Sequence, residues 1–278
     1  MPVPVETRAN MRAQTRLQAW IALGMRHAWR SLRGYDEDDA GEFVALAVLL
    51  VLAAQRQSVM LVDAYIALLL RQRAIGLNPD RIIGGLRGAT TLDEVYRRPF
   101  VTVWTGLRDG RSFEDATRAG LHRAVAAAVL DVQLAQRAAL QAAQDASSTT
   151  RTTQTQRGNR GDTGGGGREA QRGNTRTTQI YGFARAANPG ACAFCRLVDG
   201  AYVKRADAMA LHPHCRCSLV PLSGPHPGAA RLPDGTPISQ LTPQVDVPGV
   251  ALHHHGEYGA VLSDPRHNFL SEASALAR

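Results

Sequence analysis

The stretch that decides the fold class is residues 112–144, SFEDATRAGLHRAVAAAVLDVQLAQRAALQAAQ. Ser112 and Asp115 are three residues apart, which is the spacing of a capping box at a helix N-terminus. The residues that follow are rich in alanine, leucine and glutamine, which have high helix propensity. The sequence therefore predicts a helix that begins at Ser112 and ends near Asp145, within a mainly α N-terminal domain.

A second helical segment is predicted over residues 36–76, where apolar residues recur at helical spacing. The acidic cluster that begins at Asp36 suits the positive end of a helix dipole, and Gly76 gives a stop. The pattern leaves open whether this segment is one long helix or two stacked short ones.

Residues 95–110, VYRRPFVTVWTGLRDG, connect the two helical segments. Because Pro99 interrupts a helix, we expect a short extended or buried piece here. Arg97 and Arg98 are expected to face water, with DNA contact as the alternative. The three tryptophans have apolar neighbours and are interpreted as core or interface anchors: Trp20, Trp29 and Trp104.

The composition changes after residue 146 to Ser, Thr, Gln, Gly and Arg, with almost no apolar residue to bury. Apolar residues return near Ile180, and the chain after Leu222 is rich in Pro and Gly. We therefore expect four parts: a helical domain (1–146), a flexible basic linker (147–178), a small α+β, zinc-ribbon-like module (179–223) and an irregular Pro/Gly-rich tail (224–278).

The net charge of +8 implies an anionic partner, either nucleic acid or an acidic protein surface. Almost all of the positive charge is arginine, which a GC-rich genome also tends to produce. The linker holds six arginines, for which a solvated tether is favoured over DNA contact. The N-terminal residues lack the apolar run of a secretory signal, and residues 43–54 are too short to span a membrane. We expect synthesis in the cytoplasm and no membrane partner.

All four cysteines lie within residues 192–217. Cys192 and Cys195 form a CxxC pair, and Cys215 and Cys217 form a CxC pair. Nineteen residues separate the pairs, within the ~15–20 that are common between zinc half-sites. Metal binding is favoured over a disulfide framework in a chain made in a reducing compartment.

A closed, structural Zn²⁺ site is the favoured interpretation of this segment, with metal-free thiols or a disulfide as alternatives. The first three ligands are Cys192, Cys195 and Cys215, and the fourth is His212 or Cys217. Asp199-Gly200 between the pairs predicts a turn that folds the second half back onto the first. The zinc would substitute for the core that such a small module cannot build.

The order CxxC, spacer, HPHCRCSLVPL resembles the C-terminal module of the Mu F-like minor head proteins of tailed bacteriophages. The matching residues are Cys192, Cys195, His212, Cys215, Cys217 and Pro221. Residues 255–272 are also similar to the tail of such proteins in phages of GC-rich actinobacteria. The resemblance covers roughly the last 100 residues; the long polar insertion at 147–178 departs from it.

This resemblance implies a virion component that is present in few copies, near the portal or inside the head. It implies the portal or other head proteins as partners, a role in capsid assembly or DNA packaging, and synthesis in the host cytoplasm. The alternative is a zinc-stabilised protein whose linker arginines contact packaged DNA.

No catalytic residues are predicted, and we expect a protein that is not an enzyme. The run His253–His255 beside Glu257 suggests a metal site or a nuclease, but three consecutive histidines on an extended loop cannot all face one ion. An HNH-type nuclease would also need a histidine after Asn268, and none follows. Exposed polar loop residues are the favoured interpretation.

Overall fold

The computed structural model describes residues 3–158, 178–188, 191–210, 217–264 and 267–268. The helices are α1 (Val5–Arg30), α2 (Glu37–Leu70), α3 (Pro79–Ile83), α4 (Leu92–Arg108), α5 (Phe113–Gly158) and α6 (Ala193–Leu197). The strands are β1 (Gln179–Ala186), β2 (Tyr202–Val203), β3 (Ser218–Gly224), β4 (Ala251–His255), β5 (Gly259–Asp264) and β6 (His267–Asn268). Short 3₁₀ turns are η1 (Ala206–Ala208), η2 (Pro227–Ala229), η3 (Ile238–Gln240) and η4 (Gln244–Asp246).

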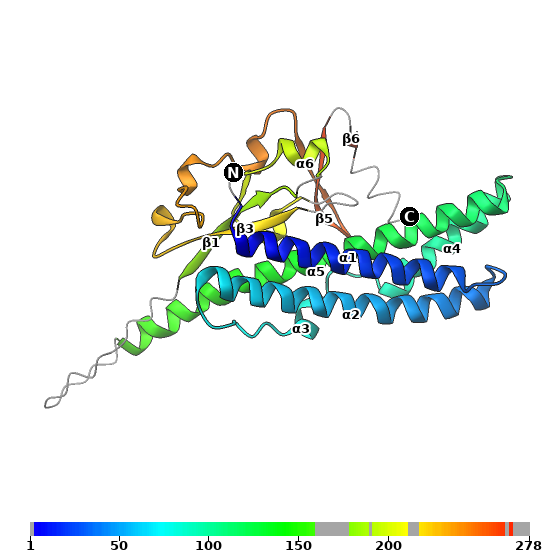
Figure 1. Ribbon diagram of the computed structural model, residues 1–278, viewed down its shortest axis with the longest axis horizontal. Coiled ribbons are helices and arrows are strands. Elements are labelled where there is room, and N and C mark those ends of the chain that lie inside the picture. Colours follow the sequence, from blue (N-terminus) through cyan, green and yellow to red (C-terminus); the bar gives the residue numbers. More distant parts are fainter. Residues whose placement is uncertain (1–2, 159–177, 189–190, 211–216, 265–266, 269–278) are drawn as a thin grey trace, which may run out of the picture.

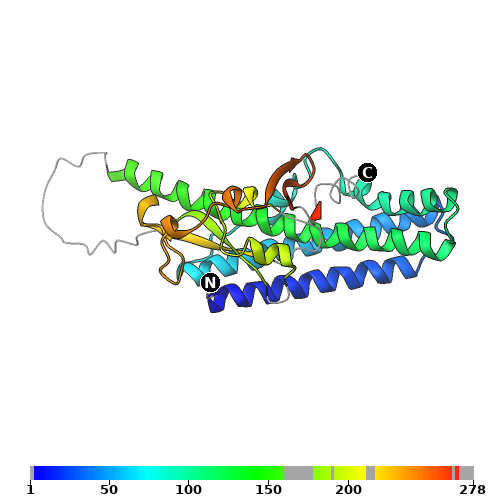
Figure 2. The same ribbon diagram turned by 90° about the horizontal axis from the view of Figure 1, so that it is seen from above.

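The long helices lie side by side along the length of the molecule, and the strands cover one side of this bundle (Figures 1 and 2). The fold is thus mainly helical with a small sheet-containing C-terminal region, as the sequence predicts. The zinc-ribbon part of that expectation has no support in the described residues and stays a prediction.

Helix α5 is the central helix of the fold. Ser112 Oγ accepts the N–H of Asp115 at 3.1 Å, which confirms the predicted start of this helix. Nearly every side chain from Ala124 to Ala143 is buried, because α1, α2, α4 and β1 all pack around this segment. The predicted end near Asp145 is wrong, since α5 continues to Gly158 and includes the first part of the expected linker. Residues 159–177 of that linker lie outside the described residues.

Helix α2 is one continuous helix, which settles the choice that its sequence left open. Asp36 caps it by accepting the N–H of Asp39 at 3.0 Å, and Arg71 ends it in a left-handed conformation. By length and composition alone α2 would suffice to cross a membrane, a property that the core helices of soluble proteins share. Its inward face packs against α1, α4 and α5.

Helix α4 corrects the prediction for residues 95–110, because it runs through Pro99. Thr91 and Glu94 form a complete capping box that starts the helix. Pro99 has no N–H group, so the helix lacks one main-chain hydrogen bond there. The burial of Tyr96, Phe100 and other residues of the same face offsets that loss. Packing therefore decides this element against its local propensity.

The first sheet has the strand order β2-β1-β3 and is antiparallel. Pro221 lies on β3, an edge strand, opposite Phe183 of β1. An edge position tolerates a residue without an N–H, which suits Pro221. The turn predicted at Asp199-Gly200 is present, with Gly200 at φ 77°, and it joins α6 to β2.

The tail is more ordered than the irregular segment expected from its sequence. Its first part follows the edge of the first sheet, where Ser223 pairs with Arg231. The second part forms a β4–β5–β6 antiparallel sheet. Tyr258 of the β4–β5 turn and Val261 of β5 are buried in the largest apolar cluster, so the tail contributes to the core as well as covering it.

The two largest apolar clusters of the described residues lie along the molecule. One holds aromatic side chains of α1, α2 and α4, where the ring of Trp29 contacts those of Phe43 and Phe100 at centroid distances of 5.2 and 5.1 Å. The other joins Ile66 of α2 and Leu140 of α5 to the strands. The strands therefore do not have a core that is separate from the helices.

Candidate functional site

The first cysteine pair lies at the start of helix α6. Cys192 is the N-cap residue, and its Sγ accepts the N–H of Cys195 at 3.3 Å. The Cys192 side chain is exposed, whereas Cys195 is buried. A CxxC pair on the first turn of a helix places both sulfur atoms near the same end of that helix, which suits a metal half-site.

Cys217 of the second pair lies immediately before β3. The antiparallel pairing of β3 with β1 carries Cys217 back toward α6, where it packs in one small cluster with Cys195 and Ala191. The turn at Gly200 reverses the chain direction after α6, which allows Cys217 to lie near that helix. The structure thus brings together residues of two pairs that are far apart in the sequence, as the zinc hypothesis requires.

His212 and Cys215, the other two predicted ligands, lie outside the described residues. Within the described part of the chain, no group of three His, Cys, Asp or Glu side chains could hold an ion. Zinc binding and the choice between His212 and Cys217 therefore stay predictions. The thiol chemistry and the meeting of Cys195 with Cys217 fit a zinc site.

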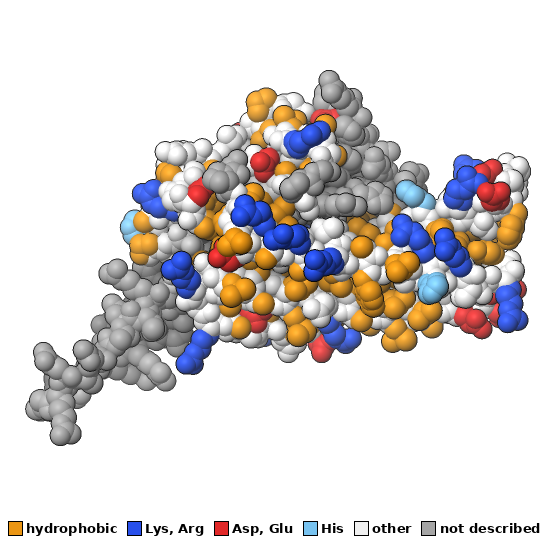
Figure 3. All heavy atoms as spheres, viewed as in Figure 1, with side chains coloured by type: hydrophobic (Ala, Val, Ile, Leu, Met, Phe, Trp, Pro, Cys, Tyr) orange, Lys and Arg blue, Asp and Glu red, His pale blue; other side chains and the backbone are white. Residues whose placement is uncertain are grey.

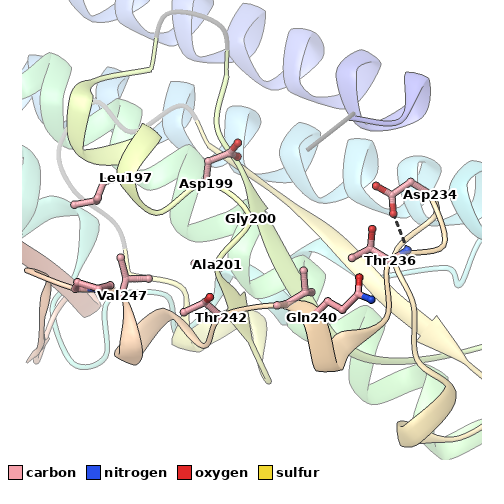
Figure 4. Close-up of a pocket in the computed structure, with 11 residues that line it drawn as sticks. Leu197, Asp199, Gly200, Ala201, Asp234, Thr236, Gln240, Thr242 and Val247 are labelled. Carbon is pink, nitrogen blue, oxygen red and sulfur yellow. Dashed lines mark hydrogen bonds between the residues drawn. The ribbon is translucent and has the colours of Figure 1, made fainter.

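A shallow hollow lies beside α6, between the turn at Asp199 and the tail (Figure 4). Its two carboxylates already bind the main chain: Asp199 accepts the N–H of Ala187 at 2.8 Å, and Asp234 accepts that of Thr236 at 2.9 Å. These hydrogen bonds shape the local turns. The hollow shows no pairing of an acid, base or nucleophile that would define a reaction.

The three consecutive histidines form strand β4 instead of the expected loop. His253 Nε2 is 2.7 Å from Ser263 Oγ of β5, and the His255 ring stacks on Tyr258 at 4.9 Å. Side chains alternate along a strand, so His254 points to the opposite face. Burial lowers the pKa of His255, and the nearby Glu257 carboxylate partly opposes this effect.

A buried cluster of charged side chains was missed by sequence analysis. Arg87, in the loop before α4, donates from Nε to Asp131 of α5 at 2.7 Å and from Nη1 to Glu257 of the β4–β5 turn. Arg98 of α4 donates to both Glu257 oxygens at 3.0 Å. Asp131 also accepts the Tyr96 hydroxyl at 2.6 Å.

The cluster is electrically balanced, with two guanidinium groups and two carboxylates. Its side chains are 0–15% exposed, so the charges interact through a medium of low polarity. Burial favours the neutral form of Arg87, but the charge and hydrogen bond of Asp131, together with Tyr258 and Tyr96, outweigh burial and raise the Arg87 pKa. Burial, followed by the Asp131 charge, raises the pKa of Tyr96. Arg87 therefore stays positively charged and Tyr96 stays neutral at neutral pH, which suits a structural role for the cluster.

The interpretation of Glu257 and Arg98 as solvated residues is therefore wrong. Arg97 is exposed as expected and pairs with Glu37 at the surface. One signal in the sequence pointed to the cluster: Asp131 is a lone carboxylate within the apolar run AVLDVQLA. No local pattern identifies Arg87 or Glu257 as its neighbours, because they are distant in the chain.

The geometry thus defines a mainly helical protein with an antiparallel sheet, beside which lie the cysteines of α6 and the cysteine that precedes β3. A family model described as VG15 protein matches residues 111–235. The matched segment runs from the start of α5 through the first sheet and includes both cysteine pairs. This match indicates a phage protein. No curated protein and no solved structure matches the chain.

Proposed function

We propose that this protein is a non-enzymatic structural component of a tailed-phage virion, which docks near the portal or inside the head. The observation that carries the proposal is the family match over residues 111–235, since it covers the central helix and the cysteine segment. The resemblance of that segment to minor head proteins is the support for the proposed location. A rigid bundle with a covering sheet suits docking between other proteins.

The test is to locate the protein in purified virions. We expect quantitative mass spectrometry to find it in the head fraction at few copies, after heads and tails are separated. The major capsid protein is the positive control, and an abundant host cytoplasmic protein measures contamination. Absence from both virions and assembly intermediates would refute the proposal, and presence only in tails would refute the head location.

A structural Zn²⁺ is part of this proposal. Cys192, Cys195 and Cys215 would hold the ion with either His212 or Cys217, which joins α6 to the start of β3. The packing of Cys195 with Cys217 supports this arrangement. When bound, the ion would supply a crosslink between two short elements of the sheet region.

Elemental analysis of the full chain tests the zinc site, with one zinc per chain expected. Replacing His212 by Ala and Cys217 by Ser, separately, identifies the fourth ligand, because only the true ligand's loss lowers the zinc content. Chain purified without chelators that contains no zinc would rule out the site.

The alternative to a structural role is nucleic-acid binding, in which the linker arginines contact DNA. Several of the chain's arginines are used internally: Arg137 donates to the Met209 and Tyr258 carbonyls at 3.1 and 2.8 Å, and Arg185 donates to Ala210. The net charge therefore overstates the number of arginines that are accessible to the phosphates of DNA. Strong duplex binding that falls steeply with salt would favour this alternative.

A further inference from the structure

The solvent side of helix α2 carries a second apolar stripe, opposite its buried face. Leu49, Met60 and Leu68 on this side are 67%, 58% and 66% exposed. On the neighbouring helix α1, Trp20 and Leu23 are also exposed, and Figure 3 shows hydrophobic side chains gathered over these two helices. A helix that is apolar on both faces usually has a partner on both faces.

The positions of the exposed stripe are symmetric about its centre, and the residues at paired positions are complementary. Its positions from Glu42 to Leu68 follow one another at intervals of three or four residues and lie on the exposed side of α2, and Arg71, the C-cap residue, comes directly after the last turn. Each position on one half of the stripe has a counterpart at the same distance on the other side of the centre, which lies between Arg56 and Gln57. This gives four pairs. The pairs are Glu42 with Arg71, Ala45 with Leu68, Leu49 with Ala64 and Ala53 with Met60.

In each apolar pair a large side chain stands opposite an alanine. If a second α2 lies antiparallel across the first, with a two-fold axis at that centre, each Leu or Met fits into the space beside an alanine. Alternating large and small residues allows two helix surfaces to interdigitate closely. The outer pair places the Glu42 carboxylate opposite the Arg71 guanidinium, once at each end of the seam.

The centre of the seam is also compatible with self-association. The axis places Arg56 opposite Gln57 of the other copy, so the two Arg56 side chains are offset from each other. Arg56 already pairs with Asp80 of its own chain at 2.8 Å, which offsets its charge. From Glu42 to Arg71 the seam is about 45 Å long at ~1.5 Å per residue.

We propose that the exposed face of α2 is the interface of a symmetric homodimer, in which two α2 helices pack antiparallel about an axis between Arg56 and Gln57. A two-fold interface must be complementary to itself, which this pattern is and which a site for an unrelated partner need not be. Membrane insertion fits less well, because Glu42 and Arg56 lie on the same side of α2 and Arg71 directly follows it. The proposal does not depend on the location in the virion.

Sedimentation equilibrium of the full chain tests the dimer. We expect a dimer for the natural sequence and a dissociation constant at least roughly tenfold weaker for Leu49→Glu, because symmetry places the new charge in the seam twice. Leu107→Glu, at an exposed leucine of α4, is the matched control and leaves the constant unchanged. Circular dichroism establishes that both variants are folded. A monomeric natural chain, or a dimer insensitive to Leu49→Glu, would overturn the proposal.

The register is tested by charge exchange and crosslinking. Glu42→Arg and Arg71→Glu should each weaken the dimer, and the double variant should recover it. Mixed Ala53→Cys and Met60→Cys chains should form a heterodimeric disulfide on oxidation, above the background of the natural cysteines measured with the unchanged chain. Failure of both the recovery and the crosslink would refute this antiparallel register. Vesicle binding by the unmodified monomer would assign the face to a membrane.

Discussion

Two adjacent arginines show how burial sets the importance of an ion pair. Arg97 pairs with Glu37 at the surface, where both side chains are more than half exposed. Arg98, the next residue, points inward and binds Glu257, which is 6% exposed. Water screens the first pair and competes for its hydrogen bonds, whereas the second pair lies in the buried cluster. The local sequence is the same for both; only their position on α4 differs.

Replacing Glu257 by Gln should therefore be costly. The change removes a charge that faces both Arg87 and Arg98, and leaving a buried charge uncompensated typically costs about 3–5 kcal/mol. Glu37→Gln is the matched control, with an expected loss of no more than about 1 kcal/mol. Urea unfolding of both variants measures the free energies. Equal losses would show that the cluster contributes no more than a surface pair.

Asp39 holds the turn between α1 and α2. Its Oδ2 accepts the N–H groups of Arg33, Gly34 and Tyr35 at 3.1, 2.6 and 2.6 Å. The hydrogen bond from Gly34, followed by those from Tyr35 and Arg33, lowers the Asp39 pKa below its ordinary value of 3.8. A lowered carboxyl pKa in the folded state means that the ionised form stabilises the fold.

This stabilisation should be present above the ordinary pKa and should disappear as pH falls through the lower, folded pKa. We expect Asp39→Asn to be less stable than the natural chain at neutral pH and to lose less stability on acidification. Thermal melts across the acid range measure the difference. Asp38→Asn, at an exposed neighbour on the same turn, is the control. The hypothesis fails if both variants show the same acid slope as the natural chain.

At the scale of elements, the α4–α5 contact depends on a glycine. A Cβ added at Gly120 of α5 would lie 2.7 Å from Val103, 2.8 Å from Trp29 and 2.9 Å from the Pro99 carbonyl oxygen. The two helices can approach this closely only because Gly120 has no side chain. The aromatic cluster around Trp29 packs at the same place.

Gly120→Ala should destabilise the protein, even though alanine favours helix. The overpacking cost of about 1–3 kcal/mol should exceed a propensity gain of about 1 kcal/mol. Gly41→Ala on α2 meets no atom within 4 Å and should be neutral or stabilising. Chemical unfolding compares the two variants. A stabilised Gly120→Ala protein would show that the helices can separate there at little cost.

At the scale of the whole molecule, the largest apolar cluster is shared by helices and strands. Phe183 of β1 and Leu219 of β3 are fully buried in the cluster that contains Ile66 and Leu140 of the long helices. Neither layer can separate without exposing apolar surface of the other. The sequence instead suggests a C-terminal module tethered by a linker, and unfolding experiments distinguish these two arrangements.

We expect one cooperative unfolding transition. Far-ultraviolet circular dichroism reports the helices, and the reactivity of the buried Cys195 thiol reports the sheet. Their urea midpoints should coincide, and Phe183→Ala should lower both by a similar amount, at a cost of about 3–5 kcal/mol. Cysteine labelling at lower urea than the loss of helix would support independent parts.

The sequence by itself determined the helical class, the starts of α2 and α5 and the turn at Gly200. These features rest on capping residues, periodicity and glycine conformation, which act over a few neighbouring residues. It also proposed that the two cysteine pairs meet, and the packing of Cys195 with Cys217 is consistent with that.

Only the tertiary structure decided the rest. Helix α4 passes through Pro99 because its buried face outweighs one lost hydrogen bond, and α5 continues beyond the predicted end. Arg87, Asp131 and Glu257 meet although long stretches of chain separate them. The physical reason is that capping and propensity are local, whereas burial and charge pairing depend on which distant segments the folded chain brings together.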